Sequence, residues 1–415
     1  MDGIDESRAQ RPPKSALVIG AGVVGVTTAY ALARRGVAVT LIDKADGPAR
    51  GASFANGAQL SYCYTEAMAS PALLRHLPAL ALGLDPAFRL KPYFDPGALV
   101  WLLRLLRNAT AGQFRANTLA GLTLGLESQL AMQALLDRHP LEFGHKVAGK
   151  MIVYQIEQAF ASARAMVDLK RPYGAQQEVL SPAEAIRIEP ALAARTDPIV
   201  GAIYAPQEAL GDPHRFCEGL LSVLEHDYGV SVRMGTTVAS WEDAPDTVSA
   251  ICASGERIEA DHLVLCAGIE ARSHLKRLGL GSALMPMKGY SFTAAPGAAA
   301  PEMSITDVSR KIVFCPLDGQ IRVAGLAELG SQNNAVDQER LADLTAAAAH
   351  SLPQAANYTS THSGWAGFRP MTANSLPIIQ RMSPRITINV GHGMLGWTYA
   401  MGSAERVARL MEGHS

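Results

Sequence analysis

The order of apolar and polar residues near the start of the chain predicts a strand, a helix and a second strand. Residues 15–20 form a short apolar run that is typical of a buried strand. Residues 23–35 are predicted to be helical, and residues 38–42 to form a second strand that ends at Asp43. Together they make a β-α-β unit of about thirty residues. The polar, proline-containing residues 1–14 predict a loose tail.

Further along, the pattern changes several times. Residues 67–130 are rich in leucine, and Leu99 to Leu106 has the spacing of an amphipathic helix. Residues 145–155 are predicted to contain a strand, and Ser181-Pro-Ala-Glu has the signature of a helix start. Residues 285–330 alternate in the manner of strands, and a helix is expected from about Trp397 to Met411.

Composition narrows the class of protein. A chain of 415 residues with 48% hydrophobic and 18% charged residues suits two globular domains. The net charge of −1, without a basic block, argues against nucleic-acid binding. Five cysteines without a C-x-x-C pair favour neither a disulfide framework nor a metal site. A reducing, cytoplasmic location is therefore expected.

Residues 16–33 carry no charge and resemble a signal peptide or a membrane span. We reject both interpretations, because the preceding tail contains Asp2, Asp5 and Glu6 instead of a positive segment. The run also contains three glycines with another explanation.

Those glycines, Gly20, Gly22 and Gly25, match the pattern G-x-G-x-x-G between the first strand and the helix. The first allows a tight turn, the second a close approach of a pyrophosphate, and the third close helix packing. Asp43 follows eighteen residues after Gly25, where a carboxylate can bind ribose hydroxyls. The spacing predicts a dinucleotide site. The single N-terminal motif and the small-residue loop at 51–59 favour FAD over NAD.

A second glycine-rich segment, residues 391–398, precedes the last predicted helix. Backbone amides at a helix start stabilise negative charge, such as the charge that develops on a reduced flavin. His392 in this segment is predicted to be structural rather than a catalytic base, and Trp397 to be a core residue that also has a chance of lining a pocket.

Together these residues resemble the D-amino-acid oxidase and glycine oxidase superfamily, and most closely its bacterial D-amino acid dehydrogenase group. The resemblance extends from Ser15 to about Met411. It rests on six segments: residues 18–26, 53–59, 286–291, 321–328, 367–372 and 391–398. The family's aspartate after Pro-x-Thr is replaced here, in the run 371–375, which puts details of the C-terminal flavin contacts in doubt.

The resemblance implies an α/β fold with a Rossmann-like FAD-binding domain and a second α+β domain, which binds substrate on a mixed, partly antiparallel sheet. Residues 15–66, 181–281 and 362–415 are assigned to the first domain, and residues 67–180 and 282–361 to the second. The residues expected to bind FAD are Gly20, Gly22, Val23, Val24, Gly25, Asp43, Lys44, Ser53, Asn56, Gly57, Gln59, Val238, Ala267, Gly268, Gly391, Gly393, Met394, Leu395, Gly396, Trp397 and Thr398.

The resemblance also implies the chemistry. Arg369 would bind the substrate carboxylate, because a guanidinium forks onto a carboxylate with two parallel bonds. Tyr290, Gln59 and Trp397 are the other expected catalytic residues. A hydride would pass from the α-carbon of a D-amino acid to flavin N5, and the imino acid would hydrolyse to a 2-oxo acid and ammonia. No strong protein base is needed if the amine binds deprotonated.

The group's dehydrogenases pass electrons to a membrane quinone. The leucine-rich segment 71–106 is a candidate for peripheral contact with the inner face of the plasma membrane, although a packed helical segment explains it as well. Three alternatives stay open at this point: a dehydrogenase or oxidase of D-hydroxyproline or another secondary amine, a flavin-binding protein without turnover, and an NAD-linked dehydrogenase.

Overall fold

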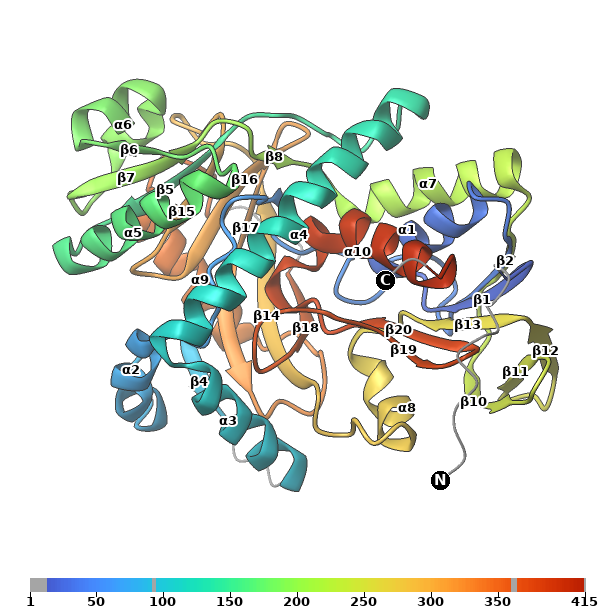
Figure 1. Cartoon of the computed structure of the whole chain (residues 1–415). Helices are drawn as coiled ribbons and strands as arrows, with labels where there is room; N and C mark the ends of the chain where they lie inside the picture. The colour runs from blue at the N-terminus through green and yellow to red at the C-terminus, as the bar shows by residue number, and fades with distance from the viewer. Residues whose placement is uncertain (1–12, 92–94, 360–363, 414–415) are drawn as a thin grey trace.

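The computed structural model describes residues 13–91, 95–359 and 364–413. Most of the predicted tail, residues 1–12, lies outside the described residues. The described chain forms two large sheets that lie beside each other, with a long helix crossing in front (Figure 1). The predicted β-α-β unit is confirmed, with the second strand at the predicted bounds.

The first sheet has six strands. In spatial order they are β19 (Ile378–Ser383), β20 (Ile386–Val390), β13 (His262–Leu265), β1 (Ser15–Ile19), β2 (Ala38–Ile42) and β9 (Ser231–Arg233). All neighbours are parallel except β19, which pairs antiparallel with β20. Because both faces are covered, β1 is apolar on both: Ala16 and Val18 pack in one core cluster, Leu17 and Ile19 in another.

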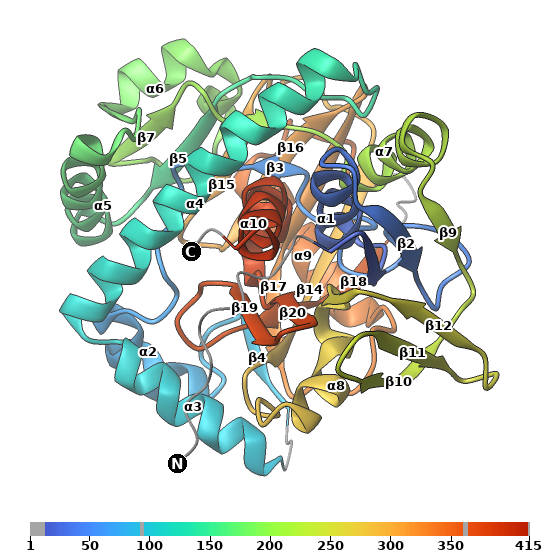
Figure 2. The same ribbon diagram turned by 45° about the vertical axis from the view of Figure 1, so that its right-hand side comes forward.

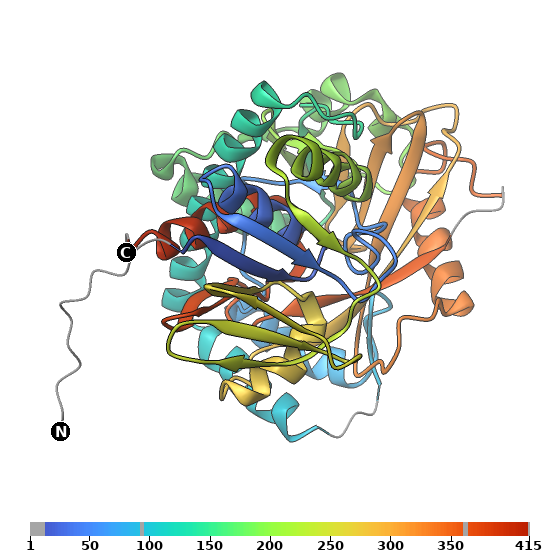
Figure 3. The same ribbon diagram turned by 90° about the vertical axis from the view of Figure 1, so that its right-hand side faces the viewer.

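Helices cover one face of this sheet, and a small sheet covers the other. The helices are α1 (Val23–Ala33), α7 (Pro213–Tyr228), α10 (Gly396–Met411) and, across α10, α4 (Ala111–Arg138). Figure 2 shows α10 end-on between α1 and α4. The opposite face is covered by β10 (Val238–Asp243), β11 (Val248–Cys252), β12 (Arg257–Ala260) and α8 (Ala271–Arg277), and the yellow-green small sheet lies beneath the blue strands in Figure 3.

The second sheet is mixed, as predicted. Its strands, in spatial order, are β18 (Trp365–Met371), β14 (Met285–Ala294), β17 (Gln320–Leu329), β16 (Ile312–Leu317), β15 (Ser304–Asp307), β5 (Lys150–Tyr154), β7 (Gly201–Ala205) and β6 (Glu178–Leu180), with β4 (Phe88–Leu90) added beside β17. The pairs β15–β5 and β17–β4 are parallel. Strands β7 and β18 fall in segments assigned to the FAD-binding domain, so at these two strands the predicted boundaries need correction.

Helices and short pairings complete the fold. They are α2 (Pro71–Ala81), α3 (Pro96–Asn108), α5 (Glu157–Lys170), α6 (Pro182–Ile188), α9 (Gln338–Ser351), the 3-10 turns η1 (Arg171–Tyr173), η2 (Pro190–Ala194), η3 (Gly268–Glu270) and η4 (Gly393–Leu395), and the pair β3 (Gln59–Leu60) with β8 (Ala209–Leu210). The predicted helix start at Ser181 is confirmed as a capping box with Glu184. The predicted strand at 145–155 is shorter, because Gly149 with φ +80° precedes β5.

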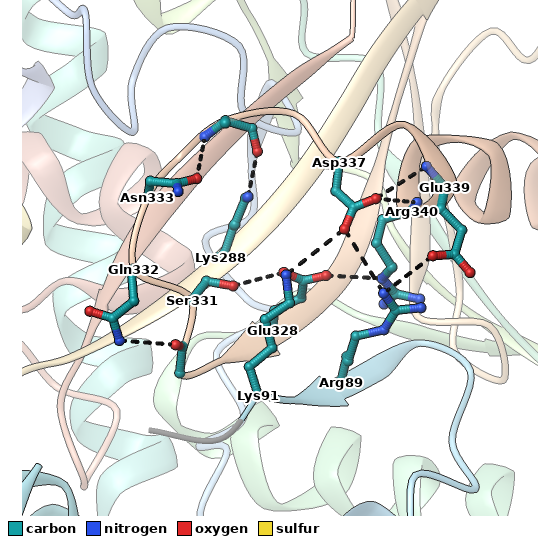
Figure 4. A network of polar contacts seen from close by, with 12 residues as sticks. Arg89, Lys91, Lys288, Glu328, Ser331, Gln332, Asn333, Asp337, Glu339 and Arg340 are labelled. Atoms are coloured by element: carbon teal, nitrogen blue, oxygen red, sulfur yellow. Dashed lines mark hydrogen bonds and ion pairs between the residues drawn. The ribbon is translucent and has the colours of Figure 1, made fainter. Parts of the chain in front are cut away.

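A buried carboxylate anchors the leucine-rich segment to the second sheet. Glu328 at the end of β17 is fully buried, and its oxygens lie 3.2 Å from Arg340 Nε and 3.5 Å from Lys91 Nζ (Figure 4). Lys91 follows β4, and Arg340 lies on α9. This network therefore fixes β4, which joins α2 to the chain leading into α3, against the edge of the sheet.

Candidate active site

Four of the predicted binding segments meet at one edge of the six-stranded sheet. Strands β20, β13, β1 and β2 are adjacent and parallel, so their carboxyl ends lie together. Gly391, Gly20 and Asp43 follow their strands directly, and Ala267 lies two residues after β13. Ligands of open α/β sheets bind at this edge. Segments far apart in the sequence are thus brought into one site.

The glycine turn between β1 and α1 leaves no room for side chains. Gly20 has φ +104°, and a Cβ on it would lie 2.7 Å from the Cys266 carbonyl oxygen. A Cβ on Gly25 would lie 1.7 Å from the Gly20 carbonyl oxygen. Gly22 is the N-cap of α1 and has no side chain to cap the helix; Val23 N–H donates to Ser53 Oγ, so an anion would meet the other backbone N–H groups of the first turn. Val23 and Val24 begin the helix. This cradle fits the pyrophosphate of FAD.

The ribose side of the site is formed by the end of β2. Asp43 accepts hydrogen bonds from the backbone N–H groups of Ala21 (2.6 Å) and Ala45 (2.8 Å), which fix its carboxylate beside the glycine turn. Lys44 is exposed and forms a surface ion pair with Glu270 at 3.1 Å. Val238 is buried in the core beneath β2. Only Asp43 of these predicted residues presents a fixed polar group to the site.

The loop after Arg50 joins the two sheets. Ser53 Oγ accepts a hydrogen bond of 3.2 Å from Val23 N–H at the start of α1. Asn56 Oδ1 accepts one of 2.9 Å from Ala58 N–H. A Cβ on Gly57 would lie 3.2 Å from Val313 on β16, and Ser291 on β14 donates a hydrogen bond to the Ala55 carbonyl. The loop therefore passes between α1 and the face of the second sheet.

Gln59 follows this loop, and its amide is held from both ends. Its Nε2 donates to Ser304 Oγ, and its Oε1 accepts a hydrogen bond of 2.9 Å from Lys150 Nζ. Two residues later, Ser61 N–H donates to Thr398 Oγ1 at 2.9 Å. Thr398 lies in the first turn of α10, so residues 59–61 and the glycine-rich segment 391–398 form one wall.

The C-terminal segment turns sharply before α10. Gly391 and Gly393 have φ of +82° and +57°, and Met394 is exposed, while Leu395 and Gly396 are partly exposed. His392 points away from this surface, is buried, and lies 3.0 Å from Ser403 Oγ through Nε2. Burial lowers the pKa of His392 to about 3, so it is neutral at ordinary pH. Its predicted structural role agrees with this position.

Trp397 lies in the core of the first domain. Its indole N–H donates to the Gly211 carbonyl at 3.1 Å, and its ring centroid lies 4.8 Å from that of Phe216. The residue is only 4% exposed. Its position therefore fits the core interpretation and offers no direct catalytic role.

Arg369 on β18 has a free guanidinium edge. Its Nη1 donates to the Leu326 carbonyl at 3.0 Å, and among the residues described no carboxylate pairs with it. The guanidinium lies over Gly289 of the neighbouring strand, where a Cβ would be 2.2 Å from Nη2. Burial lowers the pKa of Arg369 to about 10, which leaves it charged at neutral pH. A partly buried cation without an acidic partner is suited to a carboxylate ligand.

Tyr290 lies on the other face of the second sheet. It packs in the cluster that contains Leu344 of α9, and its hydroxyl has no hydrogen-bond partner in the described part of the chain. Burial, and then the charge of Glu328, raises the pKa of Tyr290. Because neighbouring strand residues point to opposite faces, Ser291 reaches the loop at Ala55 while Tyr290 does not.

Two features of the site were not predicted. Trp365 lies four residues before Arg369 on β18, and its ring lies over Gly367. Gly367 pairs with Gly289 on the neighbouring strand. Lys150 is buried next to Gln59. The alternation of β18 could have placed Trp365 on the same face as Arg369. No local signal marks a buried lysine, because lysines are rarely buried.

Known proteins are similar to this chain in sequence and in fold. The DAO family, described as FAD dependent oxidoreductase, matches residues 15–410. A D-amino acid dehydrogenase 2 of Ralstonia nicotianae is 39% identical over 406 residues, which covers 95% of each protein. A D-amino acid dehydrogenase 2 of Pseudomonas aeruginosa is 36% identical over 399 residues, or 94% of this chain and 93% of the relative.

Solved structures agree on the fold. Glycine oxidase from Geobacillus kaustophilus superposes with a TM-score of 0.73 at 20% identity, covering 98% of this chain and 96% of the other. L-proline dehydrogenase from P. horikoshii gives 0.72 at 17% identity, covering 97% and 94%. The glycine cradle, the fixed Asp43 and the family match lead to one conclusion: this chain belongs to the DAO family of FAD-dependent oxidoreductases, and its cofactor is FAD.

Proposed function

We propose that this enzyme oxidatively deaminates D-amino acids and that Arg369 binds the substrate carboxylate. The similarity to two D-amino acid dehydrogenases over nearly the whole chain supports the reaction. The observation that carries the assignment of Arg369 is its charged guanidinium, which projects from β18 without an acidic partner among the described residues. A planar fork of N–H donors binds a carboxylate through two parallel bonds.

The residues of the chain orient the substrate. FAD, when bound, would supply the acceptor for the hydride that leaves the α-carbon. Arg369 holds the carboxylate, and its bond to the Leu326 carbonyl fixes the direction of the guanidinium. His392 is neutral and bonded to Ser403, so it does not take up the amine proton. We expect the substrate amine to enter deprotonated, and the imino acid to leave and hydrolyse in water.

The test is a kinetic comparison of the wild type with Arg369→Ala and Arg369→Lys. Loss of a charge-assisted pair is worth about 1.5–3 kcal/mol, so Arg369→Ala should lower kcat/KM for D-alanine at least about tenfold. Arg369→Lys should recover part of this loss, since it keeps the charge but not the fork. Flavin absorbance of each variant controls for cofactor content. Near-normal kinetics in Arg369→Ala would remove Arg369 from the substrate site.

The substrate class is tested separately by adding D-alanine, D-proline and D-hydroxyproline to the anaerobic enzyme. Bleaching of the flavin by D-alanine, with slow recovery in air, would support a D-amino acid dehydrogenase. Faster bleaching by the cyclic secondary amines would move the assignment to that class. A yellow protein that no amine bleaches would leave the family in place and refute the proposed substrate.

We further propose that a quinone in an anionic membrane accepts the electrons, and that the α2–β4–α3 segment contacts that membrane. Both views in Figures 1 and 2 place α2 and α3 together at one end of the molecule. Large apolar side chains are exposed there: Leu82 is 74% exposed, Leu84 70%, Leu90 55%, Leu99 61% and Leu103 58%. Exposed apolar residues gathered in this way are typical of an interaction surface.

The charged side chains of this segment favour an anionic membrane as its partner. Arg75, Arg104 and Arg107 are exposed on the same helices, which matches a surface of anionic lipid headgroups. Within the described ranges, no helix is long and apolar enough to cross a bilayer.

Flotation with vesicles that contain phosphatidylglycerol tests the contact. The wild type should float, and Leu99→Asp/Leu103→Asp should not. Leu130→Asp is the matched control, because Leu130 is 74% exposed on α4, outside this segment. Equal flotation of all three proteins, or of none, would contradict the assigned surface.

A further inference from the structure

A group of buried ionisable side chains surrounds the segment that follows Gln59. Lys150 and Lys170 are 2% and 0% exposed, and Glu208 is 2% exposed. Lys170 Nζ binds the Cys63 carbonyl at 2.7 Å and Glu66 Oε1 at 2.6 Å. Burying a charge is costly unless it makes specific contacts, so each of these groups needs a reason to be there.

Glu208 serves the backbone of this segment. Its two carboxylate oxygens accept hydrogen bonds from the N–H groups of Tyr62 and Cys63, the latter at 2.7 Å. Burial raises the pKa of Glu208 to about 7, and the charge of Lys150 opposes this rise. Glu208 and Lys170 thus hold residues 62 and 63, on the side of the segment that leads away from Gln59.

Lys150 acts on the other end of the segment. Its Nζ donates to Gln59 Oε1 at 2.9 Å and to Ser61 Oγ at 2.8 Å, and it lies 4.4 Å from the centroid of the Tyr64 ring. Within the part of the chain that the structure describes, no carboxylate lies at ion-pair distance from this ammonium. Its hydrogen-bond partners are therefore the neutral side chains of Gln59 and Ser61.

The pKa of Lys150 shows the balance of forces around it. Burial lowers this pKa to about 8, while the carboxylates of Glu208 and Glu66 act in the opposite direction. The two carboxylates therefore favour the charged form of Lys150 against the effect of burial. A positive charge that survives complete burial is available to act on whatever binds next to it.

The wall formed by Gln59, Ser61 and Thr398 lies on the side of the site where the ring of FAD belongs. The pyrophosphate sits at the start of α1, and Asp43 at the end of β2 receives the ribose. A dinucleotide extends in both directions from its pyrophosphate, so the ring extends away from β2. On that side the chain presents segment 391–398 and, bonded to it, residues 59–61.

We propose that Lys150 is a positioning residue for the flavin ring: it fixes the Gln59 amide and Ser61 against the ring and supplies positive charge that favours the reduced cofactor. This inference rests on the proposed placement of Gln59 and Thr398 beside the ring, and it is independent of which amino acid is oxidised. Hydrogen bonds and charge near the ring edge are the means by which a protein tunes a flavin.

The midpoint potential of the bound FAD, measured without any amino acid, tests this proposal. Lys150→Met keeps the apolar stem but removes the charge and both donors. We expect the reduction equilibrium to shift at least tenfold toward the oxidised form, which is about 30 mV for a two-electron couple. Lys170→Met is the matched control: it removes an equally buried lysine that does not contact Gln59, and its reduction equilibrium should stay within twofold of the wild type.

Two further variants separate positioning from general charge. Lys150→Gln keeps a donor for Gln59 but is neutral, and it should also lower the potential; it replaces Lys150→Met if that variant does not fold. In a double-mutant cycle, Gln59→Leu combined with Lys150→Met should shift the potential by less than the sum of the single changes, because the two residues act as one unit. Additive shifts, an unchanged potential in both Lys150 variants, or an equal shift in Lys170→Met would each overturn the proposal.

Discussion

Substituting Gly289 by alanine should disable Arg369 without removing it. A Cβ on Gly289 would lie 2.2 Å from Nη2, 2.4 Å from Cζ and 2.7 Å from Nη1 of Arg369. At separations under 3 Å one of the two groups must shift, and here the guanidinium, at the end of a flexible side chain, has to leave its place on the strand. Its 3.0 Å bond to the Leu326 carbonyl then breaks. Gly289 does not have a positive φ, so the backbone accepts alanine and the strand should persist.

The expected loss in kcat/KM follows from the hydrogen bonds to the substrate carboxylate that the displaced Arg369 guanidinium no longer makes. A hydrogen bond to a charged group contributes about 1.5–3 kcal/mol, and 1.36 kcal/mol corresponds to a factor of ten. We therefore expect kcat/KM for D-alanine to fall by about tenfold to about 150-fold, mostly through KM. The assay is initial rates with an artificial electron acceptor over a range of D-alanine concentrations, with flavin absorbance as the measure of intact enzyme.

Gly112→Ala is the control, because it lies near the start of α4 with open space around its Cβ and should leave the kinetics unchanged. A Gly289→Ala enzyme with full flavin content and wild-type kcat/KM would refute the reasoning. It would mean either that Arg369 moves aside without loss or that it does not bind the carboxylate.

Three other substitutions test the cofactor cradle and the buried polar groups. Gly25→Ala should abolish FAD retention, because its Cβ would lie 1.7 Å from the Gly20 carbonyl oxygen; a purified variant with normal flavin absorbance would contradict this. His392 has its pKa lowered to about 3, so below pH 6.5 the unfolded chain binds a proton that the folded chain does not. Stability should therefore fall as the pH drops, by about 1.4 kcal/mol per pH unit from this group, and urea unfolding at pH 7 and 5.5 should show a shallower loss in His392→Asn. Glu328→Gln should cost about 3–5 kcal/mol in unfolding free energy, because Arg340 keeps its charge in a buried place; an unchanged denaturation midpoint would show that the network in Figure 4 is dispensable.

Features set by neighbouring residues could be predicted from the sequence. The cradle is one: Gly25 must lack a side chain because its Cβ would meet the carbonyl of Gly20, five residues earlier, within the same turn. The β-α-β unit is another, since continuous apolar runs specify strands that are buried on both faces. The family resemblance also pointed to Arg369, whose guanidinium has no acidic partner among the described residues.

Features that depend on which surfaces meet were decided only by the tertiary structure. Strand alternation places Tyr290 and Ser291 on opposite faces, but the packing of α9 and of the loop at Ala55 determined which face each residue meets. Trp397 is buried because α10 turns it toward Phe216.

Lys150 is the clearest case. Its sequence neighbourhood is an ordinary strand, and its role arises because β5 places it beneath Gln59, ninety-one residues away. Sequence determines local geometry and periodicity through short-range sterics and the burial of apolar faces. The partner of a buried charge is decided by long-range packing, because the cost of desolvation is offset only by groups that the fold brings together.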